Sequence, residues 1–321
     1  MSNPIVFLYP GQGAQYHHMG GELRSGHPVF AASIAHSSEL CSAYLSPSLL
    51  EVLYDPAKRK HHPFDDLRYS HPALLAFELA LSDTLLAEGI RPALFLGYSL
   101  GEFVAMTSSG VLSREQAFTL VCSQAKAVLE TTRASSMLAI LSEESLFHHR
   151  DDLFKETWLA AVNSPGHFVV SGFPEVLAQL HVRLQAEGIT SLILPVSRGF
   201  HSALVDPLRT RFFDLVTGIP LNASGLSHVS CALQRRLSPA DFGPELFWAI
   251  LRRPVQFQRT LQWLETSGPY TYIDLGPSGT LANFARQILP ATSASTVHHL
   301  VTGFGREIES LRDFLEQRSH S

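Results

Sequence analysis

Residues 93–102 read Ala-Leu-Phe-Leu-Gly-Tyr-Ser-Leu-Gly-Glu. Its apolar part predicts a strand over 93–98 that is buried on both faces, and a helix follows over 100–108. Residues 97–101 match G-x-S-x-G, a sharp strand-to-helix turn that exposes its serine and needs small neighbours. We predict Ser99 as a nucleophile, with a chance match in a glycine-containing turn as the alternative.

Strand-like runs and helical periods alternate on both sides of this turn. Helices are predicted over 74–88 and 114–131, the second with Ser113 as its N-cap. A strand over 270–275 and a helix over 279–289 repeat the pattern near the end of the chain. This alternation predicts an α/β fold in which helices cover a buried sheet.

The middle of the chain follows a different order, βαββαβ, which is the ferredoxin-like pattern. Residues 163–166, Asn-Ser-Pro-Gly, predict a hairpin between its two central strands. We therefore predict a small ferredoxin-like subdomain over 133–197, inserted into a larger subdomain formed by 1–132 and 198–321. The expected strands are 137–141, 158–162, 168–171 and 191–196, with a helix over 174–187.

Composition excludes several classes of function. The chain has 321 residues, 45% of them hydrophobic, which is enough for a substantial core. A formal net charge of −5 argues against nucleic-acid binding, which needs a basic surface. No apolar run approaches the roughly 20 residues of a membrane span, and Met1–Pro4 lead into a strand without a basic leader. We expect a cytoplasmic protein that does not bind membranes.

The cysteines and histidines do not predict a metal site. Three well-separated cysteines, Cys41, Cys122 and Cys231, offer neither a disulfide framework nor CxxC spacing, so we interpret them as reduced packing residues. The sixteen histidines include adjacent pairs, but none has the i, i+4 spacing with an intervening glutamate that zinc hydrolases use.

Serine is a poor nucleophile near neutral pH and needs an adjacent base. Among the histidines, His201 follows a strand end and Gly199, where a side chain can project into a cleft. A surface or core histidine is the alternative. The glycine-flanked loop over 9–15 follows the first strand and would let a backbone N–H approach a developing oxyanion; a phosphate loop or a plain turn is its alternative.

Taken together, these stretches resemble the malonyl-CoA:acyl-carrier-protein transacylases and the acyltransferase domains of polyketide synthases. The resemblance spans roughly residues 4–290 and rests on six motifs in the family's order. They read PGQG, GYSLGE, NSPG, FH, PVQF and GP, at residues 10–13, 97–102, 163–166, 200–201, 254–257 and 276–277.

The resemblance implies an α/β-hydrolase-like core with a ferredoxin-like insert, and a reaction through an acyl ester on Ser99 with His201 as base. The backbone amides of Gln12 and Leu100 would form the oxyanion hole. A main-chain carbonyl, that of Gln256, would orient His201, and Asn163 would support the site from behind. The partner would be an acyl carrier protein whose phosphopantetheine arm is part of the substrate, with no separate cofactor, and the chain would be a monomer.

The chain departs from the family where the acyl group binds. The family holds the malonyl carboxylate with an arginine twenty-five positions after the serine, and here position 124 is Gln124. Tyr98 stands in place of the usual histidine before the nucleophile, and His71 in place of a glutamine. In the segment linked to the choice of acyl group, malonyl enzymes tend to read His-Ala-Phe-His, and this chain reads Arg198-Gly199-Phe200-His201, with Phe200 in the predicted acyl pocket. Arg198 could replace the lost cation from another direction, with a solvent-facing arginine as the alternative.

Loss of the cation with retention of the catalytic pair favours neutral acyl groups. Within the family, trans-acting homologues that lack the arginine resemble this chain best, and they clear stalled short acyl units from carrier proteins. We therefore predict an acyl hydrolase that proofreads polyketide assembly. Transfer of malonyl or a neutral acyl group to a carrier is the alternative, and a non-catalytic carrier-binding module or an ordinary esterase represents a different class.

Overall fold

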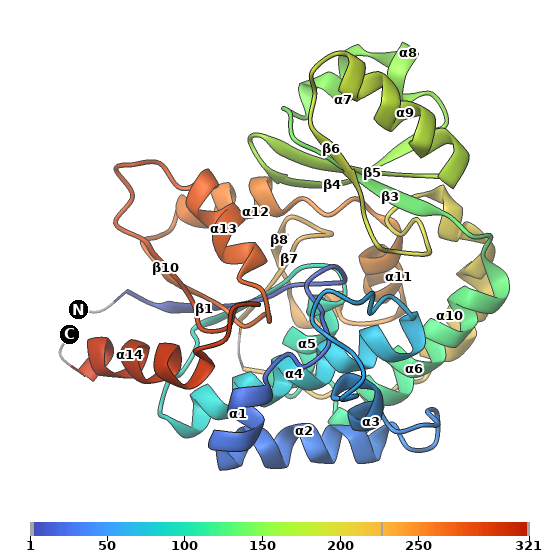
Figure 1. Ribbon diagram of the computed structural model, residues 1–321. Coiled ribbons are helices and arrows are strands. Elements are labelled where there is room, and N and C mark those ends of the chain that lie inside the picture. Colours follow the sequence, from blue (N-terminus) through green and yellow to red (C-terminus); the bar gives the residue numbers. More distant parts are fainter. Residues whose placement is uncertain (1–2, 226, 320–321) are drawn as a thin grey trace.

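The computed structural model describes residues 3–225 and 227–319 and contains two sheets (Figure 1). The strands are β1 (Ile5–Tyr9), β2 (Leu94–Gly97), β3 (Ser136–Ile140), β4 (Thr157–Ser164), β5 (His167–Gly172), β6 (Ser191–Ile193), β7 (Ser227–Ser230), β8 (Arg235–Arg236), β9 (Thr271–Asp274) and β10 (Thr296–His299). The α-helices are α1 (Gly21–Gly26), α2 (Pro28–Leu40), α3 (Leu49–Leu53), α4 (Leu67–Ala87), α5 (Gly101–Ser108), α6 (Arg114–Thr131), α7 (Ser145–His149), α8 (Asp151–Phe154), α9 (Pro174–Ala186), α10 (Arg209–Val216), α11 (Pro244–Arg252), α12 (Phe257–Glu265), α13 (Thr280–Ile288) and α14 (Glu307–Ser319). Two short 3₁₀ helices are η1 (Ala203–Leu208) and η2 (Pro239–Asp241).

The large sheet has the strand order β10-β9-β1-β2-β7-β8, and all of its pairs are parallel except β7 with β8. Both neighbours of β1 come later in the chain, one on each side, so the topology switches direction at β1. Ligands of such sheets bind beyond the carboxyl ends of the strands at the switch point. The loop after β1 and the turn after β2 meet at that edge, which is where the sequence places Gln12 and Ser99.

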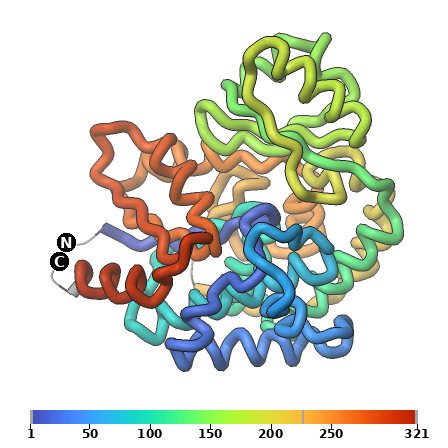
Figure 2. Tube along the Cα trace, viewed as in Figure 1, coloured from blue at the N-terminus to red at the C-terminus, as the bar shows by residue number. Residues whose placement is uncertain are grey.

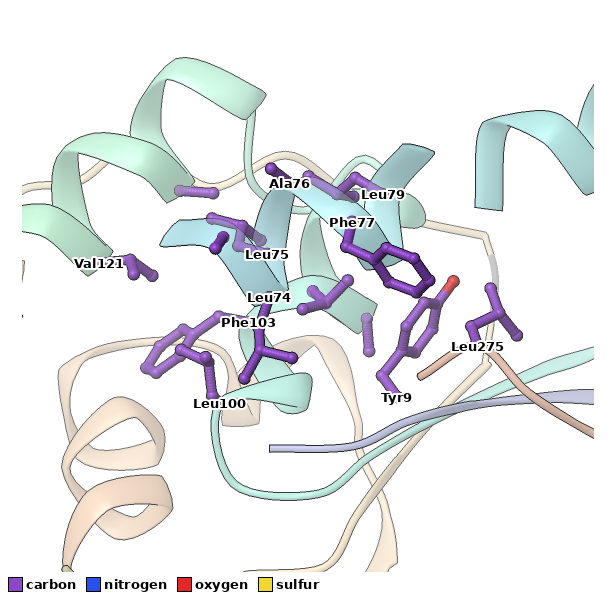
Figure 3. Packing of buried hydrophobic residues seen from close by; sticks show 14 of the residues in the cluster. Tyr9, Leu74, Leu75, Ala76, Phe77, Leu79, Leu100, Phe103, Val121 and Leu275 are labelled. Carbon is purple, nitrogen blue, oxygen red and sulfur yellow. The ribbon is translucent and has the colours of Figure 1, made fainter. Parts of the chain in front are cut away.

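The strands of this sheet are apolar on both faces because helices cover both. On β1, Phe7 and Tyr9 point into one core cluster while Val6 and Leu8 point into another. Tyr9 packs beside Phe77 and Leu275, and its hydroxyl lies 3.0 Å from Ser82 Oγ and 2.9 Å from Ser108 Oγ (Figure 3). The same cluster contains residues of α4, α5 and α6, among them Leu74, Phe103 and Val121.

The small sheet is antiparallel, with the order β4-β5-β3-β6. Its side chains alternate between two cores, since Leu138 and Ile140 pack with α8 and α9 whereas Ala139 and Val169 pack toward the large sheet. Figure 1 shows this unit as a separate lobe above the large sheet. The βαββαβ order and the hairpin between β4 and β5 were predicted from the sequence, and the predicted fold class is confirmed; the subdomain bounds at 133 and 197 stay a prediction.

Helix α4 begins at Leu67, seven residues before the predicted start at 74. Asp66 caps it by accepting a 3.0 Å hydrogen bond from the Arg68 amide, and the chain continues as helix through Pro72. Proline in a second helical turn removes one main-chain bond, so burial of the surrounding turns compensates for that loss. The early start matters because it places His71 on the helix. In Figure 2, the first and last described elements, β1 and α14, lie on the same side of the molecule.

No helix in residues 3–225 or 227–319 is long and apolar enough to cross a membrane. Cys41, Cys122 and Cys231 are buried free thiols.

Candidate active site

Ser99 lies in the turn between β2 and α5, with its backbone at φ +55°. This left-handed conformation is uncommon for a residue with a side chain and is typical of a strained nucleophile turn. The turn closes only with glycine on both sides: a Cβ on Gly97 would meet the Glu102 backbone, and one on Gly101 would meet the Tyr9 carbonyl. The serine is thereby held at the N-terminal end of α5.

The structure brings His201 next to this serine from a distant part of the chain. Ser99 Oγ lies 2.8 Å from His201 Nε2, and His201 is buried with φ +60°. Burial lowers the pKa of His201 to about 4, partly offset by a hydrogen bond to a main-chain carbonyl. The imidazole is therefore neutral near pH 7, which is the form that accepts a proton from a hydroxyl.

The other ring nitrogen of His201, Nδ1, lies 3.0 Å from the Arg253 carbonyl oxygen. The expectation that Gln256 supplies this carbonyl is wrong. The Gln256 carbonyl instead accepts from Thr260, at 2.9 Å from its amide and 2.7 Å from its hydroxyl, because Gln256 is the N-cap of helix α12. With Nδ1–H donating to Arg253, the lone pair of Nε2 faces Ser99, so no carboxylate is needed to fix the tautomer.

The small sheet holds the segment that carries His201. Ser171 Oγ on β5 donates to the Phe200 carbonyl at 2.7 Å, and Ser135 Oγ accepts from the Gly199 amide at 2.7 Å. Residues of β4 also pair with Val255, whose carbonyl accepts from the Val162 amide at 2.8 Å. The small subdomain thus holds His201 in place and also holds the segment around Val255, which follows Arg253, the residue whose carbonyl contacts His201.

The loop after β1 lies against the nucleophile turn. A Cβ on Gly11 would come within 2.8 Å of the Tyr98 carbonyl oxygen and 3.4 Å of the Leu100 amide nitrogen, so only glycine allows this approach. Gln12 and Leu100 both line the cavity that contains Ser99. This arrangement is compatible with the predicted oxyanion hole, which stays a prediction.

Ser99 and His201 open into a cavity of about 210 Å³ between the two lobes. Apolar walls that the sequence did not predict come from the small sheet, from the segment after β6 and from α13. These residues are Met137, Ala139, Val169, Leu194, Val196, Leu281 and Phe284. Gln124, His71 and Phe200 line the same cavity, as does Tyr98. Gln124 and His71 are 2% and 3% exposed. Among the described residues, no lysine or arginine lines it.

Arg198 does not replace the missing cation. Its Nε donates to Thr132 Oγ1 at 3.0 Å, and its two terminal nitrogens donate to the Ser197 and Leu129 carbonyls at 2.7 and 3.2 Å. It is absent from the cavity lining. The guanidinium instead ties the end of the small subdomain to α6.

A hydrogen-bonded chain runs along one side of the cavity. The Tyr98 hydroxyl donates to Asn163 Oδ1 at 2.8 Å, and Asn163 Nδ2 lies 3.1 Å from His167 Nδ1. His167 packs on Phe284, with ring centroids 5.0 Å apart, and burial lowers its pKa. Sequence reasoning missed His167, although it directly follows the predicted hairpin at 163–166, where a side chain facing the cavity could have been expected.

The profile of the family described as "Acyl transferase domain" matches residues 6–320. The chain belongs to the acyl transferase domain family. Curated relatives agree: it is similar to the "polyketide biosynthesis acyltransferase homolog BaeD" of Bacillus velezensis, at 39% identity over 96% of this chain and 94% of the relative. A second relative, the "polyketide biosynthesis acyltransferase homolog PksD" of Bacillus subtilis, is 34% identical over 97% and 95% of the two chains.

Solved acyl transferase structures share the fold. The acyltransferase domain from the second module of the salinomycin polyketide synthase superposes with a TM-score of 0.85 at 28% identity, covering 98% of this chain and 72% of that one. An acyl transferase fold also occurs in the "MCAT" of Streptococcus pneumoniae, with a TM-score of 0.81 at 24% identity over 98% and 99% of the chains. The predicted resemblance is therefore confirmed at the level of family and fold.

Proposed function

We propose that this protein is an acyl hydrolase that removes short, uncharged acyl groups from acyl carrier proteins during polyketide assembly. The names of the two Bacillus relatives support the setting in polyketide biosynthesis. In the proposed substrate, the acyl group is a thioester on the phosphopantetheine arm of the carrier. The protein itself needs no further cofactor for this chemistry.

The observation that carries the choice of acyl group is Gln124. It lines the cavity that contains the catalytic pair, where a carboxylate substrate would need a cation, and the lining residues supply none. A carboxylate moved from water into such a cavity loses hydration worth several kcal/mol, which a neutral amide does not return. An acetyl or other uncharged chain loses no such hydration, and the apolar walls favour it.

In the proposed reaction, His201 Nε2 takes the proton of Ser99 Oγ as the oxygen attacks the thioester carbonyl carbon. The amides of Gln12 and Leu100 stabilise the resulting oxyanion. Collapse breaks the carbon–sulfur bond, His201 returns the proton to the departing thiol, and the acyl group remains as an ester on Ser99. The second half uses the same groups: His201 takes a proton from a water molecule as it attacks the ester carbonyl, and returns that proton to Ser99 Oγ as the bond to the acyl group breaks and the acid is released.

Hydrolysis differs from transfer only in that second half, because a transferase keeps water away from the ester until a thiol arrives. Transfer of a neutral acyl group, or of malonyl, to a carrier is therefore the main alternative. The test is to incubate acetyl- and malonyl-loaded carrier with catalytic enzyme and a second, unloaded carrier of different mass, and to follow all species by intact-protein mass spectrometry.

Loss of acetyl from the first carrier with none on the second supports the hydrolase. Acetyl on the second carrier would establish a transferase instead, and preferential reaction of malonyl would refute the argument from Gln124. A small-molecule ester turned over as fast as the carrier thioester would indicate an ordinary esterase.

A carrier-binding module without catalytic activity is the alternative from another class. The 2.8 Å contact between Ser99 Oγ and His201 Nε2 argues against it, because a docking module has no need of an oriented base. Labelling by a serine-directed phosphonate separates the two, since a non-catalytic module would not react.

A further inference from the structure

Polar atoms without partners gather where the acyl group would bind. Both ring nitrogens of His71 and Oε1 of Gln124 are buried, and none of these three atoms has a hydrogen-bond partner within the described chain. Both side chains line the cavity that contains Ser99. Buried polar groups are nearly always paired, because an unpaired one loses its hydration without replacement. Such a cluster in a ligand cavity therefore indicates groups that pair with the ligand.

The chemistry of the cluster follows from the charge of His71. Desolvation by burial lowers the pKa of His71 to about 4, so the ring is neutral near pH 7. A neutral imidazole offers one N–H donor and one acceptor nitrogen, and Gln124 Oε1 adds a second acceptor. The cluster thus presents one donor and two acceptors to the cavity.

We propose that this end of the cavity selects short acyl chains that carry a hydroxyl group, which His71 and Gln124 bind directly. This inference rests on the proposed function and narrows its substrate class. A hydroxyl both donates and accepts, so it pairs with the imidazole N–H and with one of the acceptors at once.

Other acyl groups match the cluster less well. A keto oxygen only accepts, so it uses the imidazole N–H and leaves both acceptors unpaired. A plain alkyl chain covers all three polar atoms without pairing any of them. A site that hydrogen-bonds a hydroxyl rejects the analogue that lacks it much more strongly than an apolar pocket rejects an extra methylene.

The test measures acylation of Ser99, which precedes the choice between hydrolysis and transfer. Pantetheine thioesters of butyrate, 3-hydroxybutyrate, 4-hydroxybutyrate and acetoacetate are mixed with excess enzyme, and the acyl-enzyme is followed by quenched-flow intact-protein mass spectrometry. We expect at least one hydroxyacyl thioester to acylate the enzyme about tenfold faster than butyryl, and faster than acetoacetyl. Rates for both hydroxyacyl thioesters equal to or below that of butyryl would overturn the inference.

The variants Gln124→Leu and His71→Phe then locate the effect. Each is expected to lower the ratio of hydroxyacyl to butyryl acylation rates several-fold. Gln179→Leu, which makes the same chemical change on the exposed face of α9, is the control and should keep the wild-type ratio. A preference that persists in both cavity variants would also overturn the inference.

Failure of this inference is distinguishable from failure of the proposed function. Equal acylation by all thioesters refutes only the selection of a hydroxyl group. Absence of acylation by any of them refutes the proposed function and this inference together.

Discussion

Two sets of residues that line the cavity differ in how their polar groups are paired, and we call them the catalytic end, around Ser99 and His201, and the acyl end, formed by His71 and Gln124. At the catalytic end, Ser99 and His201 contact each other, Arg253 holds His201, and Asn163 bonds with both Tyr98 and His167. At the acyl end, both nitrogens of His71 and Oε1 of Gln124 have no partner in the described chain. The catalytic pair and its supports are hydrogen-bonded without a ligand, whereas His71 and Gln124 Oε1 gain partners only when a ligand binds. Gln12 Nε2, in the same cavity, also has no partner in the described chain.

We interpret the paired groups as serving the chemical reaction and the unpaired groups as serving the choice of substrate. A reaction common to a family needs fixed geometry before the substrate arrives, and paired groups keep that geometry. Selection needs groups whose pairing depends on the substrate, so their free energy is gained only on binding. The fold places Ser99 on the turn after β2 and His201 on the segment after β6, whereas His71 and Gln124 lie on helices α4 and α6.

The largest effect is expected at the catalytic end. Ser99→Ala should lower acyl release from a loaded carrier by about 10⁴-fold or more, because the ester intermediate cannot form. The measurement is single-turnover acyl loss by mass spectrometry, with circular dichroism to check the fold. Retained turnover would show that another group is the nucleophile and that the paired end is not the catalytic one.

The pH dependence of acylation reports how closely His201 is enclosed. Its folded pKa is about 4, below the ordinary value, so the neutral form and hence activity persist above that pH and fall only as pH drops through it. At pH 5 an imidazole with this pKa is about 90% neutral, against about 3% for an ordinary histidine, a roughly thirtyfold difference in rate.

The profile of kcat/KM between pH 3.5 and 7 checks this expectation. His71 has a lowered pKa in the same cavity, so the profile is repeated in His71→Phe, where the acid limb should stay in place. An acid limb near pH 6.5 would contradict the burial of His201. The free energy of unfolding should also fall as the pH drops. The reason is that His201 takes up a proton at a higher pH in the unfolded chain than in the folded one, so acid favours the unfolded chain.

The sequence predicted the catalytic residues of the site better than the residues that form its walls. Strict local requirements mark Ser99: a strand, two glycines and a helix must coincide within ten residues. The resemblance pointed to His201, which the structure places beside Ser99 although 102 positions separate them. The fold class followed from the same alternation of strands and helices, and from the βαββαβ order of the insert.

Three features of the structure could not be predicted from the sequence, each for a physical reason. The carbonyl that holds His201 belongs to Arg253, because the Gln256 carbonyl is used at the N-cap of α12. A sequence pattern locates a helix start only to within a few residues. Helix α4 begins before Pro72, which reads as a boundary when burial is unknown. The apolar walls from the small sheet depend on how two lobes meet, and no local pattern encodes that.

Adding a cation at the acyl end should redirect substrate choice. Gln124→Arg should raise malonyl acylation about tenfold or more relative to acetyl, because a guanidinium can pair bidentately with the carboxylate. Gln124→Met, similar in length but uncharged, is the matched control and should gain nothing. The readout is the ratio of malonyl- to acetyl-enzyme after short incubation. No gain in the arginine variant would mean that other lining residues, such as Tyr98 and His71, also exclude malonyl.

The smallest expected effect is a difference in the free energy of unfolding between two variants, one that removes the Tyr98 hydroxyl and one that removes the His71 imidazole. Tyr98→Phe removes a donor to Asn163 at the paired end and should lower the free energy of unfolding by about 1 kcal/mol. His71→Phe removes two unpartnered nitrogens at the acyl end and keeps the ring packing on Phe200, so the free energy of unfolding should stay equal or rise. Urea unfolding of both variants measures the difference. Equal losses would show that the imidazole is paired in solution, and the contrast between the two ends would then disappear, because a group already satisfied without ligand gains nothing from a substrate hydroxyl.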